Sequence, residues 1–559
     1  MEDPRLEPHD SNQLELKLAY VVDPGVKRQR YLVESYMFVP RTLGVSGQSY
    51  GPQRFFEDTA TFVRLKTPSV ALEALAASGR ATRWFDPVCE TLDRLLGGAP
   101  VDNAVLVRGL KTLGAIYRAS IRDEGRLLLE RFDDLDEAEA NAAPMREQDL
   151  AGTLERFVGQ LGPAVERLRA VGRRCEHAIV PGDIRDIWAV VDEYVAIYAE
   201  EIATALVAAC DARMQRTGGL VADSPLSRVR EGLADVAVSE YRYRRSRGYP
   251  SYAVPGAANE NIPRRRRILK RIISSVLFLE QRHEDGGTKQ RDMIAGFAAA
   301  LAMLFAVLVA RWAQLEWGIL SSGFVIIMVL SYIVKDRIKE WAKRYLGRRF
   351  ARWLPDYVTK VRDPQTGQVI GLSRESVGVF DASRVPPDIR ALRNSDHPAA
   401  VAEHGRSEVV IRFTKDVTLD SKGLANALTG VEGLSDIIRF NFAHFRQRMD
   451  DVIETYRIVH PETRRIVEVR CRRVYHINLV LRIARGAKDA REAFTERVRV
   501  VLDQRGILRV EEIDAVGTIQ QHTAPAADNL GFTDIPPRPR HVHPVAARGR
   551  TDLLAVRDG

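Results

Sequence analysis

The sequence predicts a membrane protein in which a two-helix transmembrane hairpin joins two cytoplasmic parts. The N-terminal part is expected to be a mainly α helical bundle, and the C-terminal part an α+β domain with an antiparallel sheet. Two uncharged stretches of membrane-spanning length, helical periodicity before them and strand-like alternation after them predict this fold class. The chain has 559 residues, of which 45% are hydrophobic, so it is long enough for several domains.

The two uncharged stretches are residues 293–310 and 317–334, with 18 residues each. As helices they would each be about 27 Å long, close to the thickness of the hydrocarbon core of a bilayer. Six residues, RWAQLE, separate them, which predicts a tight helical hairpin. The alternative is a helical hairpin buried in a large soluble core, but two such stretches in tandem are unusual in soluble folds.

Basic residues flank the two stretches on both sides. Residues 261–291 contain nine Lys/Arg and three Asp/Glu, and residues 335–352 contain eight and two. Because Lys and Arg accumulate on the cytoplasmic side of spanning segments, both flanks are expected to be cytoplasmic and to meet anionic lipid of the inner leaflet. The expected headgroup contacts are Arg264, Arg265, Arg266, Arg267, Lys270, Arg271, Lys335, Arg337, Lys339, Lys343 and Arg344.

Aromatic residues stand at the ends of the uncharged stretches. Trp312 and Trp317 are expected at the outer interface, and Tyr332, Trp341 and Tyr345 near the inner one. Amphipathic rings prefer these depths in a bilayer.

The expected location is the bacterial plasma (inner) membrane, with a multi-pass topology and both termini cytoplasmic. The first residues, MEDPRLEPHDSNQLEL, are polar and acidic, which does not fit a secretory signal peptide. Arginine outnumbers lysine by 70 to 13, a bias typical of GC-rich bacterial genomes.

The region before the uncharged stretches has three parts. Residues 13–40 alternate around a turn at Asp23–Pro24–Gly25 and predict a β-hairpin. Long amphipathic stretches with short Gly/Pro breaks follow, which favours an antiparallel helical bundle. A linker then leads to a basic amphipathic helix that begins at Arg264, and this helix suits either the membrane surface or docking on the bundle.

Period-two alternation begins near residue 406 and predicts an antiparallel sheet. A long strand starts at Ile466, with a bulge or a strand boundary at Arg473. Residues 489–504 are expected to be helical, and the tail from about 518 disordered. The predicted division is 1–67 hairpin and loop, 68–247 bundle, 248–290 linker and basic helix, 291–335 transmembrane hairpin, 336–400 juxtamembrane helix and linker, 401–517 α+β domain, and 518–559 tail.

No motif indicates catalysis, a cofactor or a metal. HExxH, Walker A, GxSxG and kinase patterns are absent from the sequence. Cys471 and His476 are five apart on one expected strand and would point to opposite faces, so they do not predict a nucleophile pair, and Cys471 is expected to be a buried thiol. His541 and His543 lie in the expected disordered tail. The acids Asp186, Asp192, Glu193, Glu200 and Glu201 are expected on a solvated helix face.

These patterns predict an integral plasma-membrane protein that anchors two cytoplasmic domains as a non-catalytic scaffold, sensor or assembly factor. One alternative is an oligomeric two-span channel gated by its cytoplasmic domains, and another is a membrane-tethered enzyme without a recognisable motif. The expected partners are the lipid bilayer, a protein partner of unknown identity and further copies of the chain. Nucleic acid is not expected, because the basic residues are concentrated beside the uncharged stretches.

Overall fold

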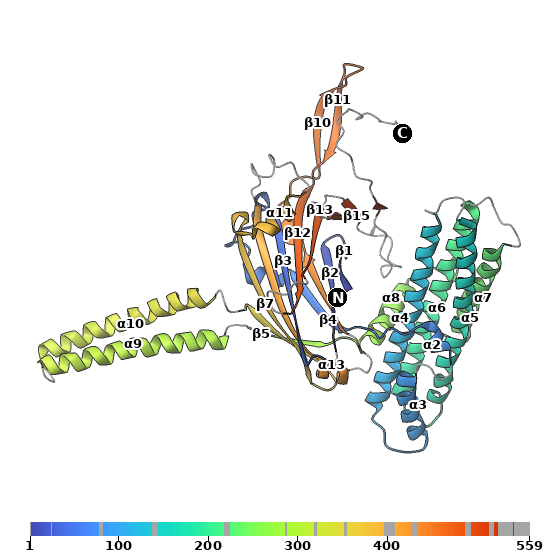
Figure 1. Cartoon of the computed structure of the whole chain (residues 1–559), viewed down its shortest axis with the longest axis horizontal. Helices are drawn as coiled ribbons and strands as arrows, with labels where there is room; N and C mark the ends of the chain where they lie inside the picture. Colours follow the sequence, from blue (N-terminus) through green and yellow to red (C-terminus); the bar gives the residue numbers. More distant parts are fainter. Residues whose placement is uncertain are drawn as a thin grey trace.

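The structure is a computed structural model of the whole chain. It describes residues 2–23, 25–77, 82–136, 143–216, 224–285, 288–317, 321–351, 355–395, 408–427, 431, 433–486, 493–513, 519–523 and 540–541. Figure 1 shows three parts: a β body in the centre, a helical bundle on one side and a long helical arm on the other.

Two antiparallel sheets form most of the β body, one of ten strands and one of four. The larger sheet has the order β16-β15-β14-β13-β12-β3-β8-β7-β6-β5, and the smaller has the order β1-β2-β9-β4. The strands of the larger sheet are β3 (Arg28–Pro40), β5 (Glu280–Asp285), β6 (Tyr357–Arg362), β7 (Val369–Asp381), β8 (Glu408–Asp420), β12 (Tyr475–Arg485), β13 (Ala493–Asp503), β14 (Gly506–Ile513), β15 (Ile519–Thr523) and β16 (Arg540–His541). The smaller sheet contains β1 (Glu2–Pro8), β2 (Gln13–Val21), β4 (Thr59–Leu65) and β9 (Gly433–Asn441).

Strands from the two ends of the chain are interleaved in both sheets. β3 lies between β8 and β12, and β2 pairs with β9. The predicted hairpin over residues 13–40 is therefore wrong, because β2 and β3 belong to different sheets. The reason is physical: the backbone N–H and C=O groups of a buried strand need partners along both edges. β2 pairs with β1 and β9, and β3 pairs with β8 and β12, so neither has an edge left for the other.

The core of the β body lies between the two sheets. Along β8 buried and half-buried residues alternate, which places Ile411, Phe413 and Val417 on one face. Rings from the short helix α1 (Pro52–Glu57) complete the contact, since Phe55 lies 5.2 Å from Phe413 between ring centroids. Other short α-helices in the described part of this body are α11 (Pro387–Arg393), α13 (Ser421–Ala427) and α14 (Ala443–Arg446).

The bundle consists of long helices joined by short connections. Its members are α2 (Leu72–Ala76), α3 (Thr82–Leu96), α4 (Asn103–Asp136), α5 (Ala143–Cys175), α6 (Gly182–Arg216), α7 (Pro225–Ser246) and α8 (Asn261–Ser274). The longer helices lie where helical periodicity predicts them. Close packing depends on small residues: Gly172 of α5 leaves the space that the ring of Trp188 of α6 occupies.

The arm is a pair of antiparallel helices, α9 (Thr288–Trp317) and α10 (Ser322–Ala351), that projects from the β body (Figure 1). The predicted two-helix transmembrane hairpin is wrong, and so is the description of the chain as a transmembrane protein built on it. Among the described residues a single helical segment, Asp292–Glu316, is long and apolar enough to cross a membrane, by length and composition only. The described structure is a mixed α+β fold of helices and large antiparallel sheets.

The position of the helix break explains this correction. The RWAQLE segment does not form a loop, because α9 continues as a helix to Trp317. The second helix begins only at Ser322, and its charged residues begin at Lys335. Its uncharged part is therefore about 20 Å long at 1.5 Å per residue, shorter than a bilayer core.

Three further expectations concern the C-terminal part. Residues 493–503, expected to be helical, form strand β13 between β12 and β14. The expected long strand is two strands, β11 (Ile466–Arg472) and β12, so Arg473 marks their boundary. In the tail, Ile519–Thr523 pairs with β14 and is not disordered, whereas residues 524–539 and 542–559 lie outside the described residues.

Candidate functional site: the helical arm

The two helices of the arm meet through small side chains. Ala298 and Ala302 of α9 are at most 2% exposed, and Ser331 of α10 is 4% exposed. Small residues allow two helices to approach closely. A helical hairpin that is stabilised by water exclusion buries its large apolar residues in the seam instead, so this arm has the reverse arrangement.

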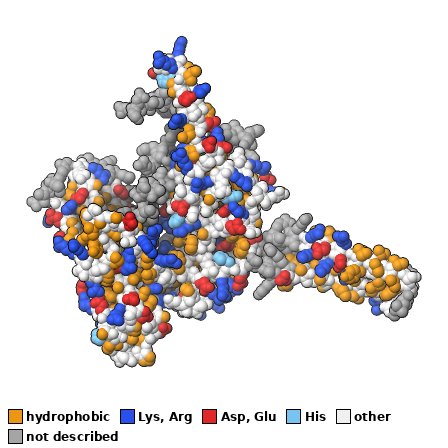
Figure 2. All heavy atoms as spheres, turned by 180° about the vertical axis from the view of Figure 1, so that it is seen from behind, with side chains coloured by type: hydrophobic (Ala, Val, Ile, Leu, Met, Phe, Trp, Pro, Cys, Tyr) orange, Lys and Arg blue, Asp and Glu red, His pale blue; other side chains and the backbone are white. Residues whose placement is uncertain are grey.

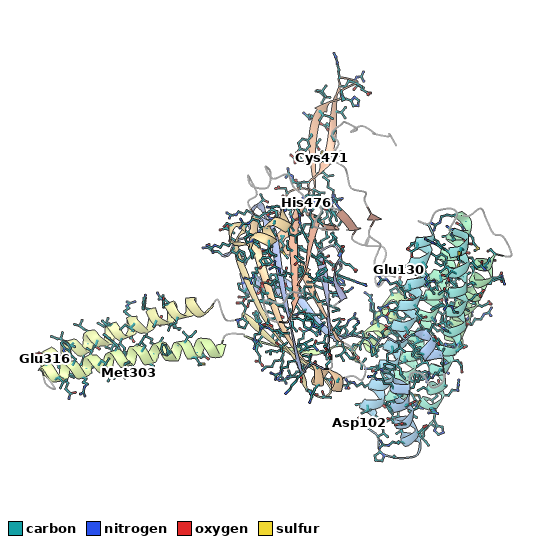
Figure 3. All side chains as sticks on the ribbon, viewed as in Figure 1. Asp102, Glu130, Met303, Glu316, Cys471 and His476 are labelled. Carbon is teal, nitrogen blue, oxygen red and sulfur yellow. The ribbon has the colours of Figure 1, made fainter. Side chains whose placement is uncertain are left out.

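The large apolar side chains of the arm face outward. Met303, for example, is 57% exposed and lies midway along α9 in Figure 3, while Glu316 lies at the far end. Figure 2 shows the hydrophobic surface over the outer part of the arm and charged side chains nearer the body. The exposed residues are Met293, Phe297, Leu301, Met303, Leu304, Val307, Leu308, Trp312 and Leu315 of α9 and Val325, Ile326, Val329, Leu330, Tyr332, Ile333, Val334, Trp341 and Tyr345 of α10.

The free energy available from covering this surface is large. Burying a fully exposed side chain of this kind contributes roughly 1.5–3 kcal/mol, so these half-exposed side chains contribute roughly 1 kcal/mol each. Together they represent on the order of 10 kcal/mol or more. A contiguous apolar surface of this size marks an interaction site rather than ordinary surface.

The inner end of α10 is basic and aromatic. Lys335 lies 4.1 Å from the ring centroid of Tyr332, and the rings of Trp341 and Tyr345 stack with centroids 5.5 Å apart. Arg337, Lys339, Lys343 and Arg344 of the same helix are exposed. Trp312 is exposed near the outer end of α9, and the side chain of Trp317 lies outside the described residues.

The basic residues of α8 are placed differently from those of α10. α8 packs on the bundle through Leu269 and Ile273, which are buried. Arg265 contacts Glu193 at 2.6 Å, and Arg266 pairs with Glu201. The structure therefore brings these two arginines to the bundle. Arg264, Arg267, Lys270 and Arg271 have exposed side chains.

The expectation of a solvated acidic face is wrong for two of its five acids, all of which lie on α6. Asp192 is 2% exposed and Glu193 is fully buried. Asp192 accepts hydrogen bonds of 2.8 Å from the hydroxyls of Tyr243 and Tyr249. Among the remaining acids, Glu200 pairs with Arg244, and Asp186 is exposed.

A second buried ionic cluster joins the two sheets of the β body. The ammonium group of Lys415 lies 2.7 Å from Asp436 and 3.4 Å from Glu375, and all three side chains are at most 4% exposed. Burial opposes the charge of Lys415, but Asp436 and Glu375 outweigh it and raise the pKa of the lysine. The hydroxyl of Tyr20 donates to Asp436 at 3.1 Å. These groups satisfy one another inside the core, which indicates a structural role.

An open cavity of about 430 Å³ in the β body is lined by residues 41 and 44–47, which follow β3, and by residues of β7 and β8. Arg41, Asp381 and Arg384 are the charged residues in its lining, and Arg41 forms an ion pair with Asp381. This arrangement does not converge on one point where a substrate atom could react.

The described residues do not contain a cluster of three or more His, Cys, Asp or Glu side chains that could hold a metal ion. Cys471 is exposed on β11, so the expectation of a buried thiol is wrong, and His476 lies on the separate strand β12 (Figure 3). His541 lies on β16, and His543 is outside the described residues. The arm is therefore the strongest candidate for a functional surface.

Comparison with known proteins does not add to this picture, since the chain matches no protein family model, no curated protein and no solved structure. The sequence does contain a signal for two of the helix contacts. Leu269 and Ile273 on one side of α8 already suited docking on the bundle. The small residues Ala298 and Ala302, four apart, already marked one side of α9 as a close helix contact.

Proposed function

We propose that this protein is a non-catalytic scaffold that attaches to a lipid surface through the apolar arm and presents the bundle and the β body beside that surface. The observation that carries the proposal is the reversed arrangement of the arm, with small side chains in the seam and large apolar ones outside. Lipid tails cover such a surface from all sides, whereas a protein partner covers one face.

The charges of the arm support the same partner. Between the apolar outer part of the arm and the β body lie the basic residues of α10, with Trp341 and Tyr345 beside them. Basic and aromatic side chains are favoured at the level of lipid headgroups, where each Lys or Arg contributes about 1 kcal/mol near anionic lipid. The proposal concerns burial of the arm in lipid and does not depend on a transmembrane hairpin, since one helical segment in the described part of the chain is long and apolar enough to cross a membrane. The bacterial plasma membrane remains a prediction from composition.

Co-flotation with vesicles tests the proposal. Protein freed of detergent in the presence of phosphatidylcholine/phosphatidylglycerol vesicles should float with the lipid and stay bound in high salt, because apolar burial is not screened. The double substitution Leu304→Lys with Leu308→Lys should abolish flotation, since each lysine costs roughly 2.5–3.5 kcal/mol in the apolar part of a bilayer.

The matched control is Leu127→Lys, which changes an exposed leucine of α4 in the bundle and should leave flotation intact. Flotation of the double variant at the level of the unaltered protein would contradict the proposal, and so would release of the unaltered protein by salt.

A further inference from the structure

A two-stranded ribbon projects from the β body, away from the arm and the bundle (Figure 1). It consists of β10 (Ile453–Val459) and β11, which pair only with each other among the described strands. Every residue of β11 is exposed. An isolated two-stranded ribbon is marginally stable in water, and its free edges present unpaired backbone groups that can pair with another strand.

The ribbon has two different faces. Directly opposed residues share a face, so the apolar pairs Tyr456–Val469 and Ile458–Val467 lie on one face, followed toward the β body by the pair Glu454–Cys471. The other face has the pairs Arg457–Glu468 and Thr455–Arg470 at its centre, with the apolar pair Val459–Ile466 beside the turn. The Glu468 carboxylate accepts a 3.1 Å hydrogen bond from Arg457.

The order of charges along β11 is self-complementary. Glu468 and Arg470 flank Val469 symmetrically. If two copies of β11 pair antiparallel with Val469 opposite Val469, each Glu468 lies opposite Arg470 of the other copy, and Val467 lies opposite Cys471. Opposite charges and apolar pairs in directly opposed positions stabilise a sheet.

Neighbouring registers match less well. A shift that centres the pair on Glu468 places two carboxylates opposite each other. A shift that centres it on Arg470 places two guanidinium groups opposite each other, and although it brings Glu468 opposite Arg472, Arg472 already forms a 2.6 Å ion pair with Asp503 of its own chain. Registers between these place apolar residues opposite charged ones. A β10 edge paired about Tyr456 brings Thr455 opposite Arg457 and Glu454 opposite Ile458, so it gains no ion pair.

We infer that a second copy of this chain pairs with the free edge of β11 about a twofold axis at Val469, which produces a four-stranded sheet in the order β10-β11-β11-β10. Isologous contacts of this kind are the commonest in symmetric dimers. This inference rests on the ribbon and is independent of the arm, so it stands or falls separately from the lipid proposal.

Disulfide trapping in the full-length protein tests both the partner and the register. Three variants are compared under mild oxidation: Val469→Cys with Cys471→Ser, Val467→Cys with Cys471→Ser, and Val467→Cys with Cys471 retained. The inferred register predicts a covalent dimer in the first and third variants and little in the second, because residue 467 then faces a serine. All three positions are exposed, so the substitutions leave the fold intact.

Equal trapping in all three variants would show random collision and overturn the inference, as would the absence of trapped dimer in the first and third. Charge reversal gives a second readout. Arg470→Glu, which faces Thr455 within its own ribbon, should weaken self-association measured by sedimentation about tenfold, because two attractive pairs become like-charge pairs. Arg470→Lys should retain it, and an unchanged constant in Arg470→Glu would also refute the inference.

Discussion

Removal of the Lys415 ammonium group should destabilise the β body more than removal of any surface lysine. Lys415→Met leaves Asp436 and Glu375 in the core without their cation, which lies 2.7 and 3.4 Å from them. Breaking a buried ion pair from one side costs about 3–5 kcal/mol, because the remaining charge is buried without compensation.

The matched control is Lys360→Met on β6 of the same sheet. Lys360 pairs with Glu284 at 2.7 Å, but both side chains are substantially exposed. Surface pairs of this kind contribute about 0–1 kcal/mol, so the control should be nearly silent. The distance from ammonium group to nearest carboxylate is the same for the two lysines and alone would predict similar losses of stability. A difference between the two variants therefore measures the effect of burial.

Hydrogen exchange is the suitable assay, since it reports on β8 and β9 separately from the bundle. Lys415→Met should accelerate exchange of the most protected amides of these strands about a hundredfold or more, with the helices of the bundle unaffected. A loss below about 1 kcal/mol, or equal effects of the two substitutions, would refute the reasoning about the buried cluster.

The same cluster makes a pH-dependent contribution to the stability of the β body. The pKa of Lys415 is raised above its ordinary value of 10.5 in the folded protein, so its contribution is fully present below that value. The contribution is lost as the pH rises through the raised pKa. The protection of β8 should therefore be independent of this group at neutral pH and decrease only in strongly alkaline solution.

The remaining predictions concern the bundle and the cysteines. Arg265→Met should lower the free energy that protects the α8 amides from hydrogen exchange by about 2 kcal/mol, because it leaves the fully buried Glu193 without its cation. The control Arg264→Met changes an exposed neighbour and should leave this protection unchanged. Equal exchange of α8 in both variants would contradict its docking on the bundle. In chemical denaturation, Gly172→Ala should destabilise the bundle by about 1–3 kcal/mol, because the added methyl group meets the ring of Trp188. Gly152→Ala places its methyl group in open space and should stabilise the bundle by about 0.5–1 kcal/mol. A change of the same sign in both variants would refute this packing. Burial raises the pKa of the Cys175 and Cys210 thiols to about 12, so mass spectrometry after brief alkylation at neutral pH should find label on Cys471 and not on these two.

Periodicity predicted the elements of this chain better than their partners. The long helices between residues 82 and 246 follow from apolar spacing alone. The alternation in 28–40 correctly indicates a strand, but nothing local tells that β3 pairs with β8, some 380 residues away. The segment 493–503 suits either a helix or a strand by sequence, because Val498, Val500 and Leu502 are buried at period two but are accompanied by charged residues that also suit a helix.

Charge was the less reliable guide to function. A run of four arginines beginning at Arg264 predicted lipid contact, but two of them contact acids on α6 that lie more than 60 residues earlier. The length of the uncharged stretches likewise does not reveal that α9 ends at Trp317 and that α10 begins at Ser322. The position of this break decides how many of the described helices are long and apolar enough to cross a membrane. The sequence pattern does not contain the tertiary partner of a charged residue or the position of a helix break.

A polarity-sensitive fluorophore at position 303 tests lipid burial of the arm most directly. Met303→Cys and, as control, Leu127→Cys are prepared with Cys471→Ser, labelled, and mixed with vesicles whose acyl chains carry bromine. Burial of the arm predicts a blue shift and strong quenching at position 303 and neither change at position 127, both of which are exposed in the protein alone. Emission at position 303 that stays at its aqueous wavelength and is unquenched in the presence of lipid would contradict the account.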